Sequence, residues 1–333
     1  MNILTSCDDN LIQYIPVQWV TIAAKIKENV DFYLMHTRVS AENIELLRDF
    51  SEKIPNLTFK EIKITDKNHI EKLEILAKHG GNWAYEAYLP LLCGEYTNCD
   101  RILCIDAGDI LFNADISPYY YCDFEDNALI ITPYQYKVEN GKITKFTSDD
   151  INILQSAHNI SCGIFNSGSY MINADYFRKN ITLDSFCEYI KEYTEKYNVI
   201  NKENSQIYFG DQGLLSLFFI DKMRYFDFEK IQSELYMPYN FCMMYFKRLD
   251  KLGYMPAILH YCGMKGKKPW DYFIDENILS RYNDTNKICK PFNLHFYKLY
   301  FISIYWEYAQ QTPCYNEMKL KALKKTKELF ENA

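Results

Sequence analysis

Short apolar segments of β-type composition alternate with amphipathic helical segments through the first two thirds of this 333-residue chain. The strand-like segments are residues 2–7, 31–37, 57–64 and 101–106, and the helix-like segments are residues 15–28, 40–54 and 84–96. Ser40 is the expected N-cap of the second helix, and Pro90 should kink the third or lie near its start. Alternation of this kind predicts an α/β fold with a mostly parallel sheet and helices on both faces.

The region after residue 127 continues the α/β pattern with fewer clear helices. Residues 128–134 and 163–177 are interpreted as strands, and residues 211–219 begin a short helix with Asp211 near its N-terminus. Residues 258–263 are interpreted as a strand that runs into a loop of glycine and lysine.

Composition narrows the class of protein. The net charge of −7 gives no reason to expect nucleic acid as a partner. The 11 cysteines include no C-x-x-C pair and no spacing typical of zinc. The N-terminus has no basic stretch before an apolar one, and no apolar run reaches about 20 residues, so we expect neither a signal peptide nor a transmembrane helix. A reduced, cytoplasmic protein is the prediction.

Two carboxylates stand at the end of a predicted buried strand, in the stretch "RILCIDAGDILFNADI". Asp106 and Asp109 follow and precede apolar runs, and a carboxylate in apolar surroundings needs a positive partner. Ligands of parallel sheets bind at the carboxyl ends of strands, so residues 7–10 and 106–109 are expected to face one cleft. An ordinary surface turn explains "DAGD" equally simply, because Asp is a common turn residue. A divalent cation such as Mg²⁺ or Mn²⁺ is the functional alternative.

Further motifs follow in a fixed order along the chain. They are "SCDDN", "FYLMHTRVSAEN", "LLCGEYTNCDRILCIDAGDILF", "FNSGSYMIN", "DQGLL", "HYCGMKGKKPW" and "WEYAQQTPCY". This ordered set, which spans roughly residues 1–315, resembles glycosyltransferase family 8. The resemblance implies a GT-A fold, a Rossmann-like mixed sheet flanked by helices, and transfer from nucleotide sugars with retention of configuration.

The resemblance also assigns site residues. In the family, the D-x-D carboxylates and the His of H-Y-x-G hold Mn²⁺ or Mg²⁺ on the donor diphosphate, which implies Asp106, Asp109 and His260 as metal ligands. The implied donor contacts are Asp8, Asn10, Asn166, Gly263 and Lys268. The implied catalytic residues, around the transferred sugar, are Asp211 and Gln212. A histidine beside carboxylates favours Mn²⁺ over Mg²⁺.

Each of these residues also has a simpler interpretation when it is taken alone. His260 would then be an ordinary strand histidine and Asn166 a turn residue. Asp8 and Asp9 would cap the following helix.

Three departures from the family pattern affect the expected chemistry. The spacing D-A-G-D replaces D-x-D, and we expect Gly108 to absorb the extra residue; otherwise Asp109 acts through water. Pro90 stands where many members have an arginine that contacts the donor. Gly213 replaces the second carboxylate of D-Q-D, which leaves an amide and Asp211 near the sugar. An amide is a poor nucleophile, so front-side attack is favoured over double displacement.

The predicted activity is transfer of galactose or glucose from a UDP-sugar to a glycan or lipid-linked acceptor, as in lipopolysaccharide biosynthesis. Two enzymatic rivals fit less well. A phosphatase needs D-x-D-x-T, and a nucleotidyltransferase needs a glycine-rich loop after the first strand. The alternative function is a catalytically silent relative that binds a nucleotide sugar or a glycan.

The last part of the chain changes character. Residues 1–275 are predicted to form the catalytic domain, and residues 276–333 a helical, aromatic and basic tail. The stretch "MKLKALKKTKELF" is a basic amphipathic helix. Either its apolar face packs on the catalytic domain, or it lies on an anionic membrane. We favour peripheral contact with the inner membrane face, because a lipid-linked acceptor would be anchored there.

Overall fold

The computed structural model describes residues 1–79, 84–133, 137–140, 142–147, 150, 164–197, 210–226, 240–242, 256–262, 268–274 and 296–331. Its strands are β1 (Asn2–Ser6), β2 (Val30–His36), β3 (Leu57–Lys63), β4 (Arg101–Ile105), β5 (Ile110–Phe112), β6 (Leu129–Ile131), β7 (Lys137–Glu139), β8 (Lys142–Thr144), β9 (Ser169–Asn173), β10 (Met223–Tyr225), β11 (Asn240–Cys242) and β12 (Ile258–His260). Its α-helices are α1 (Ile15–Lys25), α2 (Ala41–Ser51), α3 (Lys67–His79), α4 (Cys93–Tyr96), α5 (Ser117–Tyr120), α7 (Ala174–Asn180), α8 (Leu183–Tyr197), α9 (Gly210–Phe218), α14 (Phe296–Ala309) and α15 (Tyr315–Glu331). The 3-10 helices are η1 (Ile12–Tyr14), η2 (Tyr85–Leu92), η3 (Ile220–Lys222) and η5 (Pro269–Asp271).

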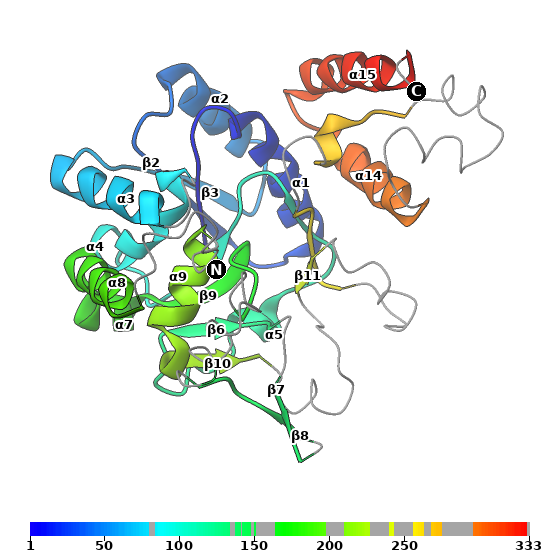
Figure 1. Cartoon of the computed structure of the whole chain (residues 1–333). Coiled ribbons are helices and arrows are strands. Elements are labelled where there is room, and N and C mark those ends of the chain that lie inside the picture. Colours follow the sequence, from blue (N-terminus) through cyan, green and yellow to red (C-terminus); the bar gives the residue numbers. More distant parts are fainter. Residues whose placement is uncertain are drawn as a thin grey trace.

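A mixed sheet of 7 strands forms the centre of the molecule, in the order β10-β6-β9-β4-β1-β2-β3 (Figure 1). β1 is parallel to β2 and β4, and β2 is parallel to β3. β9 runs antiparallel to both β4 and β6. The predicted α/β class and mixed sheet are confirmed, and the chain order β1-β2-β3-β4 follows the predicted strands.

Local sequence signals account for several element boundaries. The Ser40 side chain accepts a hydrogen bond from the Asn43 N–H and so caps α2, as predicted. Pro90 lies inside a 3-10 helix, η2, rather than in a regular α-helix, because proline lacks the N–H that an α-helix interior needs. Of residues 163–177, interpreted as strand, only Ser169–Asn173 form one (β9), and residue 163 lies outside the described residues; the interpretation is wrong for residues 164–168 and beyond residue 173. There the Asn173 side chain caps α7 through the Tyr176 N–H.

Two apolar clusters cover the two faces of the sheet. One contains residues of η2, α3, α8 and α9 together with Leu4, Ile102 and Ile172 of the strands. The other contains residues of α1 and α2 together with Ile3 and Leu103. Because neighbouring residues of one strand enter opposite clusters, the alternation of side chains along β1 and β4 separates the two layers.

A second sheet and the C-terminal helices extend this body. The small sheet has the order β11-β12-β5, with β12 antiparallel to β5. A third apolar cluster joins Leu111, Leu259 and Tyr261 of this region to Tyr305 and Trp306 of α14. The tail therefore shares a core with the catalytic part, and the domain division at residue 275 stays a prediction. None of the helices in the described residues is long and apolar enough to span a membrane.

Candidate active site

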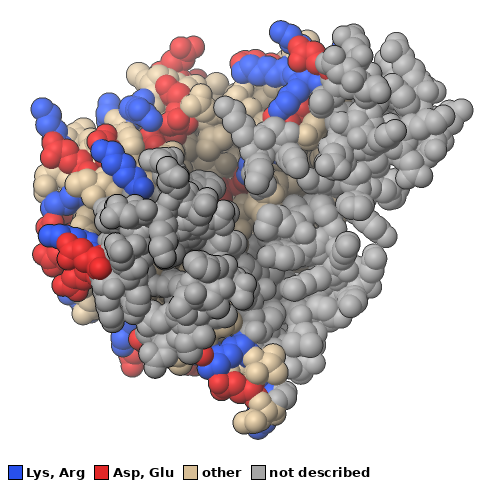
Figure 2. Space-filling model, viewed as in Figure 1, with Lys and Arg blue, Asp and Glu red and all other residues tan. Residues whose placement is uncertain are grey.

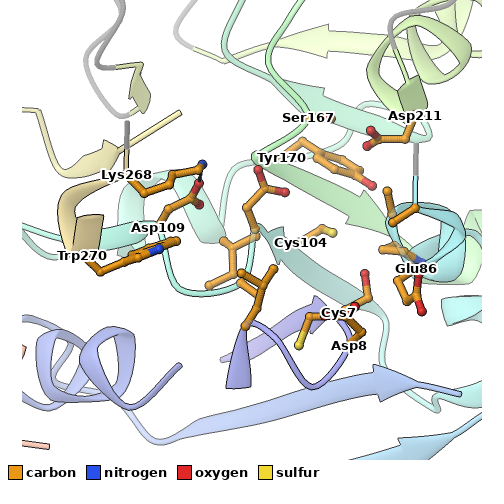
Figure 3. Close-up of a pocket in the computed structure, with 18 residues that line it drawn as sticks. Cys7, Asp8, Glu86, Cys104, Asp109, Ser167, Tyr170, Asp211, Lys268 and Trp270 are labelled. Carbon is orange, nitrogen blue, oxygen red and sulfur yellow. Dashed lines mark hydrogen bonds and ion pairs between the residues drawn. The ribbon is translucent and has the colours of Figure 1, made fainter. Parts of the chain in front are cut away.

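A cavity of about 370 Å³ opens at the carboxyl ends of β1 and β4. Its walls come from the residues after β1, from η2, from the Asp106–Asp109 loop, from the turn before β9, from the start of α9 and from the segment around η5. Figure 3 shows Lys268, Trp270 and Asp109 on one side, with Asp211 and Glu86 on the other. The predicted common cleft for residues 7–10 and 106–109 is thus present: Cys7, Asp8, Asp106, Ala107 and Asp109 all line this cavity.

Gly108 sets the shape of the Asp106–Asp109 loop. Its φ of +83° lies in the left-handed region, which costs a glycine little and other residues considerably more. A Cβ at this position would also lie 2.5 Å from Tyr14 Cβ. Gly108 therefore absorbs the extra residue of D-A-G-D, as predicted. The loop leaves Asp106 exposed and turns Asp109 inward, where it is 3 % exposed.

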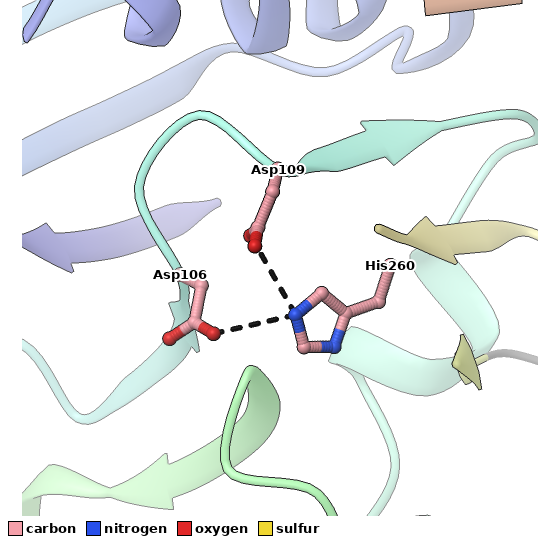
Figure 4. Close-up of side chains that lie close together, drawn as sticks. All are labelled: Asp106, Asp109 and His260. Atoms are coloured by element: carbon pink, nitrogen blue, oxygen red, sulfur yellow. Dashed lines mark ion pairs between the residues drawn. The ribbon is translucent and has the colours of Figure 1, made fainter. Parts of the chain in front are cut away.

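His260 reaches the two carboxylates because β12 pairs with β5. In this antiparallel pair His260 lies opposite Ile110, and the Tyr261 N–H donates to the Asp109 carbonyl at 2.8 Å. The imidazole Nε2 lies 3.3 Å from Asp106 Oδ2 and 3.5 Å from Asp109 Oδ1 (Figure 4). One ligand atom from each of the three side chains lies within 4.8 Å of the others. A cation could therefore contact all three side chains.

The charged side chains of this cluster shift the pKa values of His260 and Asp109. Burial by itself would lower the pKa of His260, but Asp109 and Asp106 outweigh burial and raise it to about 9. Burial raises the pKa of Asp109, yet Lys268 and His260 outweigh it and lower the pKa to about 2. The buried carboxylate is thus held in its ionised form, which is the form that binds a cation.

The donor set fits a divalent transition metal. Among the described residues, Asp109 Oδ1 and His260 Nε2 are buried side-chain atoms without a hydrogen bond. Two carboxylates and an imidazole are ligands typical of Mn²⁺ or Mg²⁺, with the imidazole favouring Mn²⁺. The backbone of Gly168 makes room for the ring: a Cβ there would lie 2.1 Å from His260 Cε1. Gly168 also accepts the Asp106 N–H through its carbonyl at 3.0 Å.

Among the described residues that line the cavity, Lys268 is the one lysine or arginine. Its Nζ contacts Asp109 Oδ2 and donates to the Tyr261 carbonyl at 3.2 Å. The Lys268 side chain is 22 % exposed and lies above the Trp270 ring, with 5.9 Å from Nζ to the ring centroid. An ammonium group at this place can meet a negatively charged ligand that enters the cavity.

Asp211, at the first turn of α9, lines a second corner of the cavity, whereas the next residue, Gln212, is buried and lies outside the cavity lining. Asp211 accepts a hydrogen bond from the Ser167 hydroxyl, and Gln212 Oε1 accepts from the Ser167 N–H at 3.3 Å. Burial, and then the charge of Asp106, raise the pKa of Asp211 to about 7. Asn166 Oδ1 accepts the Gly168 N–H at 2.8 Å, so this side chain shapes the turn beside His260.

The two aspartates of the N-terminal turn have different contacts: Asp8 lines the cavity, and Asp9 bonds to the start of α2. Asp8 lines the cavity and accepts two hydrogen bonds from Asn10, at 3.0 Å and 2.8 Å, whereas Asn10 itself is exposed and lies outside the cavity lining. Asp9 accepts from Ser40 and Asn43 at the start of α2. The interpretation that Asp8 and Asp9 cap the following helix is wrong, because η1 and α1 begin without a side-chain cap and Asp9 bonds to the start of α2 instead. Gly263 lies outside the described residues.

The sequence analysis did not identify two residues of the cavity wall, the acidic Glu86 and the aromatic Trp270. Glu86 lies on η2, is 4 % exposed, and is paired with Arg38 at 3.0 Å. Trp270 lines the cavity and stacks on Tyr14 with 4.0 Å between ring centroids. No local pattern distinguishes Glu86 from a surface residue of an amphipathic helix. The K-P-W motif contains Trp270, but the motif alone does not show that this side chain lines the cavity.

The mixed sheet, with a candidate metal site beside a cavity at its carboxyl edge, is the architecture of GT-A glycosyltransferases. Comparison with solved structures supports the assignment of the GT-A fold. The galactosyltransferase LgtC, in complex with donor and acceptor sugar analogues, aligns with a TM-score of 0.55 and 20 % identity over 81 % of this chain and 89 % of that chain. The bifunctional glycosyltransferase WbbM aligns at 0.61, with 14 % identity, over 97 % of this chain and 52 % of its own. GlyE of Streptococcus pneumoniae TIGR4 aligns at 0.55, with 15 % identity, over 99 % of this chain and 64 % of its own.

The family model of glycosyl transferase family 8 matches residues 2–273. The chain belongs to glycosyltransferase family 8. The search of curated proteins gave no match.

Proposed function

We propose that this protein is a metal-dependent retaining glycosyltransferase that moves a hexose from a UDP-sugar to a glycan or lipid-linked acceptor. The observation that carries the proposal is the convergence of Asp106, Asp109 and His260 beside a cavity that Asp106, Asp109 and Lys268 line. This arrangement suits a cation and a diphosphate. The LgtC structure, which holds donor and acceptor sugar analogues, supports a sugar donor and acceptor.

Mn²⁺, or Mg²⁺ in its place, would be held by Asp106, Asp109 and His260, with Asp109 as a direct ligand. When bound, the ion supplies positive charge against the negative charge that grows on the departing UDP. Lys268 leaves Asp109 and pairs with the same diphosphate. Asp8 and Asn10 bind the uridine part, and Gly263 allows close approach of the backbone.

The reacting sugar lies against Asn166, Asp211 and Gln212. We propose front-side attack, because Gly213 stands in place of the second carboxylate of D-Q-D and an amide is a poor nucleophile. The acceptor oxygen bonds to the anomeric carbon on the face from which the phosphate oxygen departs. The acceptor proton passes to that phosphate oxygen, so the products are the glycoside and UDP. Asp211 positions the sugar and stabilises its developing charge.

We further propose UDP-galactose or UDP-glucose as donor and a lipopolysaccharide-type glycan as acceptor. The test is UDP release and UDP binding, with and without Mn²⁺, over a panel of nucleotide sugars. Tight UDP binding should require the metal, and Asp106→Asn should abolish transfer while the circular dichroism spectrum stays unchanged. Metal-independent UDP binding of equal strength in wild type and Asp106→Asn would contradict the proposal.

A catalytically silent relative is the second candidate function. Pro90 lines the cavity where many family members have an arginine, and Gly213 on α9 removes a carboxylate. A silent relative would bind UDP with Mn²⁺ and release no UDP from any donor and acceptor pair. Turnover with a single donor is enough to reject it.

Membrane contact through α15 is a separate proposal, with the enzyme in the cytoplasm at the inner membrane face. α15 buries Met318, Ala322 and Thr326 and exposes Leu320 to 68 %. Much of its apolar side thus packs on the protein, and Figure 2 shows blue lysines with red acidic groups over the exposed side of α15. Each lysine near an anionic surface contributes about 1 kcal/mol, screened by salt. Sedimentation with anionic liposomes at low salt, and release at high salt, are expected; protein that stays in the supernatant contradicts the proposal.

A further inference from the structure

The segment Lys268–Ile274, which carries the cavity residues Lys268 and Trp270, is bound on its outer side by the C-terminal helices. Figure 1 shows this segment between α14 and α15. Trp306 of α14 donates its indole N–H to the carbonyl of Tyr272 at 2.7 Å and to that of Pro269 at 3.2 Å. Trp306 and Trp270 belong to the same apolar cluster. The segment thus has a cavity side and a tail side.

α15 holds the same segment through an ion pair and a backbone contact. Lys325 Nζ lies 2.6 Å from Asp271 Oδ1, and the other oxygen of Asp271 accepts the Lys268 N–H at 2.8 Å. The Phe273 N–H donates to Thr326 Oγ1 at 3.1 Å, and Thr326 is fully buried. Asp271 therefore connects a lysine of α15 to the backbone of the lysine that enters the cavity.

These contacts form a continuous path from the tail to the candidate metal site. Lys325 contacts Asp271, Asp271 contacts the backbone of Lys268, and the Lys268 ammonium contacts Asp109. A lysine side chain is long and flexible, so the direction of its ammonium depends on where its backbone is fixed. The Lys325 and Asp271 side chains are 40 % and 15 % exposed. A pair of this exposure stabilises a fold only weakly, which leaves alignment as its main effect.

We propose that the C-terminal helix pair is a positioning part of the donor site, in which Lys325 and Trp306 align the Lys268–Ile274 segment so that Lys268 meets the donor diphosphate. Lys325 and Asp271 are positioning residues, since they act through Lys268. This inference rests on the proposed function, because it assumes a diphosphate in the cavity. It gives the basic tail a task inside the molecule that a membrane surface does not provide.

The test compares Lys325→Met with a matched ion pair elsewhere. Lys60 and Asp31 join β3 and β2 at the same separation of 2.6 Å, and the Lys60 side chain is likewise 40 % exposed. We expect Lys325→Met to raise the UDP Kd, measured calorimetrically with Mn²⁺, and the donor KM by about 5-fold, since an exposed ion pair contributes up to about that factor. The kcat should stay within about 2-fold. Lys60→Met should leave Kd and KM unchanged while lowering Tm as much as Lys325→Met does.

Three further variants sharpen the test. Lys325→Arg keeps the charge and should restore Kd to within about 2-fold of wild type. Asp271→Asn keeps an acceptor for the Lys268 N–H and should match Lys325→Met, whereas Asp271→Ala loses both contacts and should raise Kd by about 10-fold or more. In the presence of Lys325→Met, Asp271→Asn should have no further effect.

The outcomes separate this inference from the proposed function. Wild-type protein that binds UDP with Mn²⁺, together with Lys325→Met of equal Kd and KM, overturns the inference alone. A fall in Tm or kcat with unchanged Kd also overturns it, because that result describes a purely structural contact. Wild-type protein without any Mn²⁺-dependent UDP binding overturns the proposed function, and this inference with it.

Discussion

Two corners of one cavity shift the pKa of a carboxylate in opposite directions. Asp109 is 3 % exposed, yet Lys268 and His260 outweigh its burial and lower its pKa to about 2. Among the described residues, Asp211 has Ser167 and backbone groups as favourable partners, and burial together with Asp106 raises its pKa to about 7. The difference teaches that a positive partner decides the direction in which the pKa of a carboxylate shifts in this cavity. In the proposed function the first corner holds the cation, and the second exchanges hydrogen bonds with the transferred sugar.

The largest expected effect on kcat/KM comes from removing the negative charge of Asp109. Asp109→Asn removes the charge of a proposed metal ligand and leaves Lys268 and His260 without their shared carboxylate. We expect kcat/KM with Mn²⁺ to fall by about 10³-fold or more, the scale of losing a metal's electrostatic help. Steady-state UDP release and Mn²⁺ binding by electron paramagnetic resonance check this. Asp49→Asn on the exposed side of α2 is the control. A loss of less than 10-fold would show that the corner does not hold the ion.

The second effect concerns the corner that contains Asp211. Asp211→Asn keeps the shape of the side chain and removes its ability to carry charge, so kcat should fall by about 10²-fold. Asp211 should matter more than Gln212, and Gln212→Ala is therefore expected to retain more activity than Asp211→Asn. UDP and Mn²⁺ affinities should stay near wild type, because the metal corner is intact. A wild-type rate for Asp211→Asn rejects the role of this carboxylate.

The same variant should change how stability depends on pH. The pKa of Asp211 is raised from 3.8 to about 7 on folding, so the folded protein keeps a proton that the unfolded chain releases. This contribution is fully present below pH 3.8 and is lost as pH rises through about 7. Between pH 5 and pH 8 the wild type should lose about 2 kcal/mol of unfolding free energy relative to Asp211→Asn, after allowance for water in the cavity. Urea titrations in EDTA measure this difference. Parallel pH profiles for both proteins would show that Asp211 is ionised throughout.

The smallest expected effect is a fall in Mn²⁺ affinity when Gly168, which lies against the His260 ring, is replaced. A methyl group in Gly168→Ala would collide with the His260 ring, so Mn²⁺ affinity should fall by about 10-fold. In a His260→Ala background the same change should have no further effect, because the ring is gone. Gly94→Ala, which would meet the backbone of Arg178 at 2.6 Å, is the control and should lower Tm without changing Mn²⁺ affinity. Unchanged Mn²⁺ affinity in Gly168→Ala would show that His260 is not a ligand of the metal.

The sequence by itself determined the order of the elements and the acidic groups at strand ends. The alternation of apolar periods marks β1 to β4 and the helices between them, because each period reflects one face that must be covered. Asp8, Asp106 and Asp109 were predictable as neighbours, since the carboxyl ends of parallel strands meet at one edge of the sheet. The left-handed turn at Gly108 followed from the extra residue in D-A-G-D.

Only the tertiary structure decided the contacts between distant segments. His260 joins Asp106 and Asp109 because β12 pairs with β5, and Glu86 faces the cavity because η2 packs beside β1. The tail shows the limit most clearly. A helix with one apolar and one basic side has the same sequence pattern whether protein or lipid covers the apolar side. The structure shows Met318 and Ala322 packed in a core shared with Trp270, and Lys325 paired with Asp271. A pattern determines which side must be covered, and the packing of the whole chain determines what covers it.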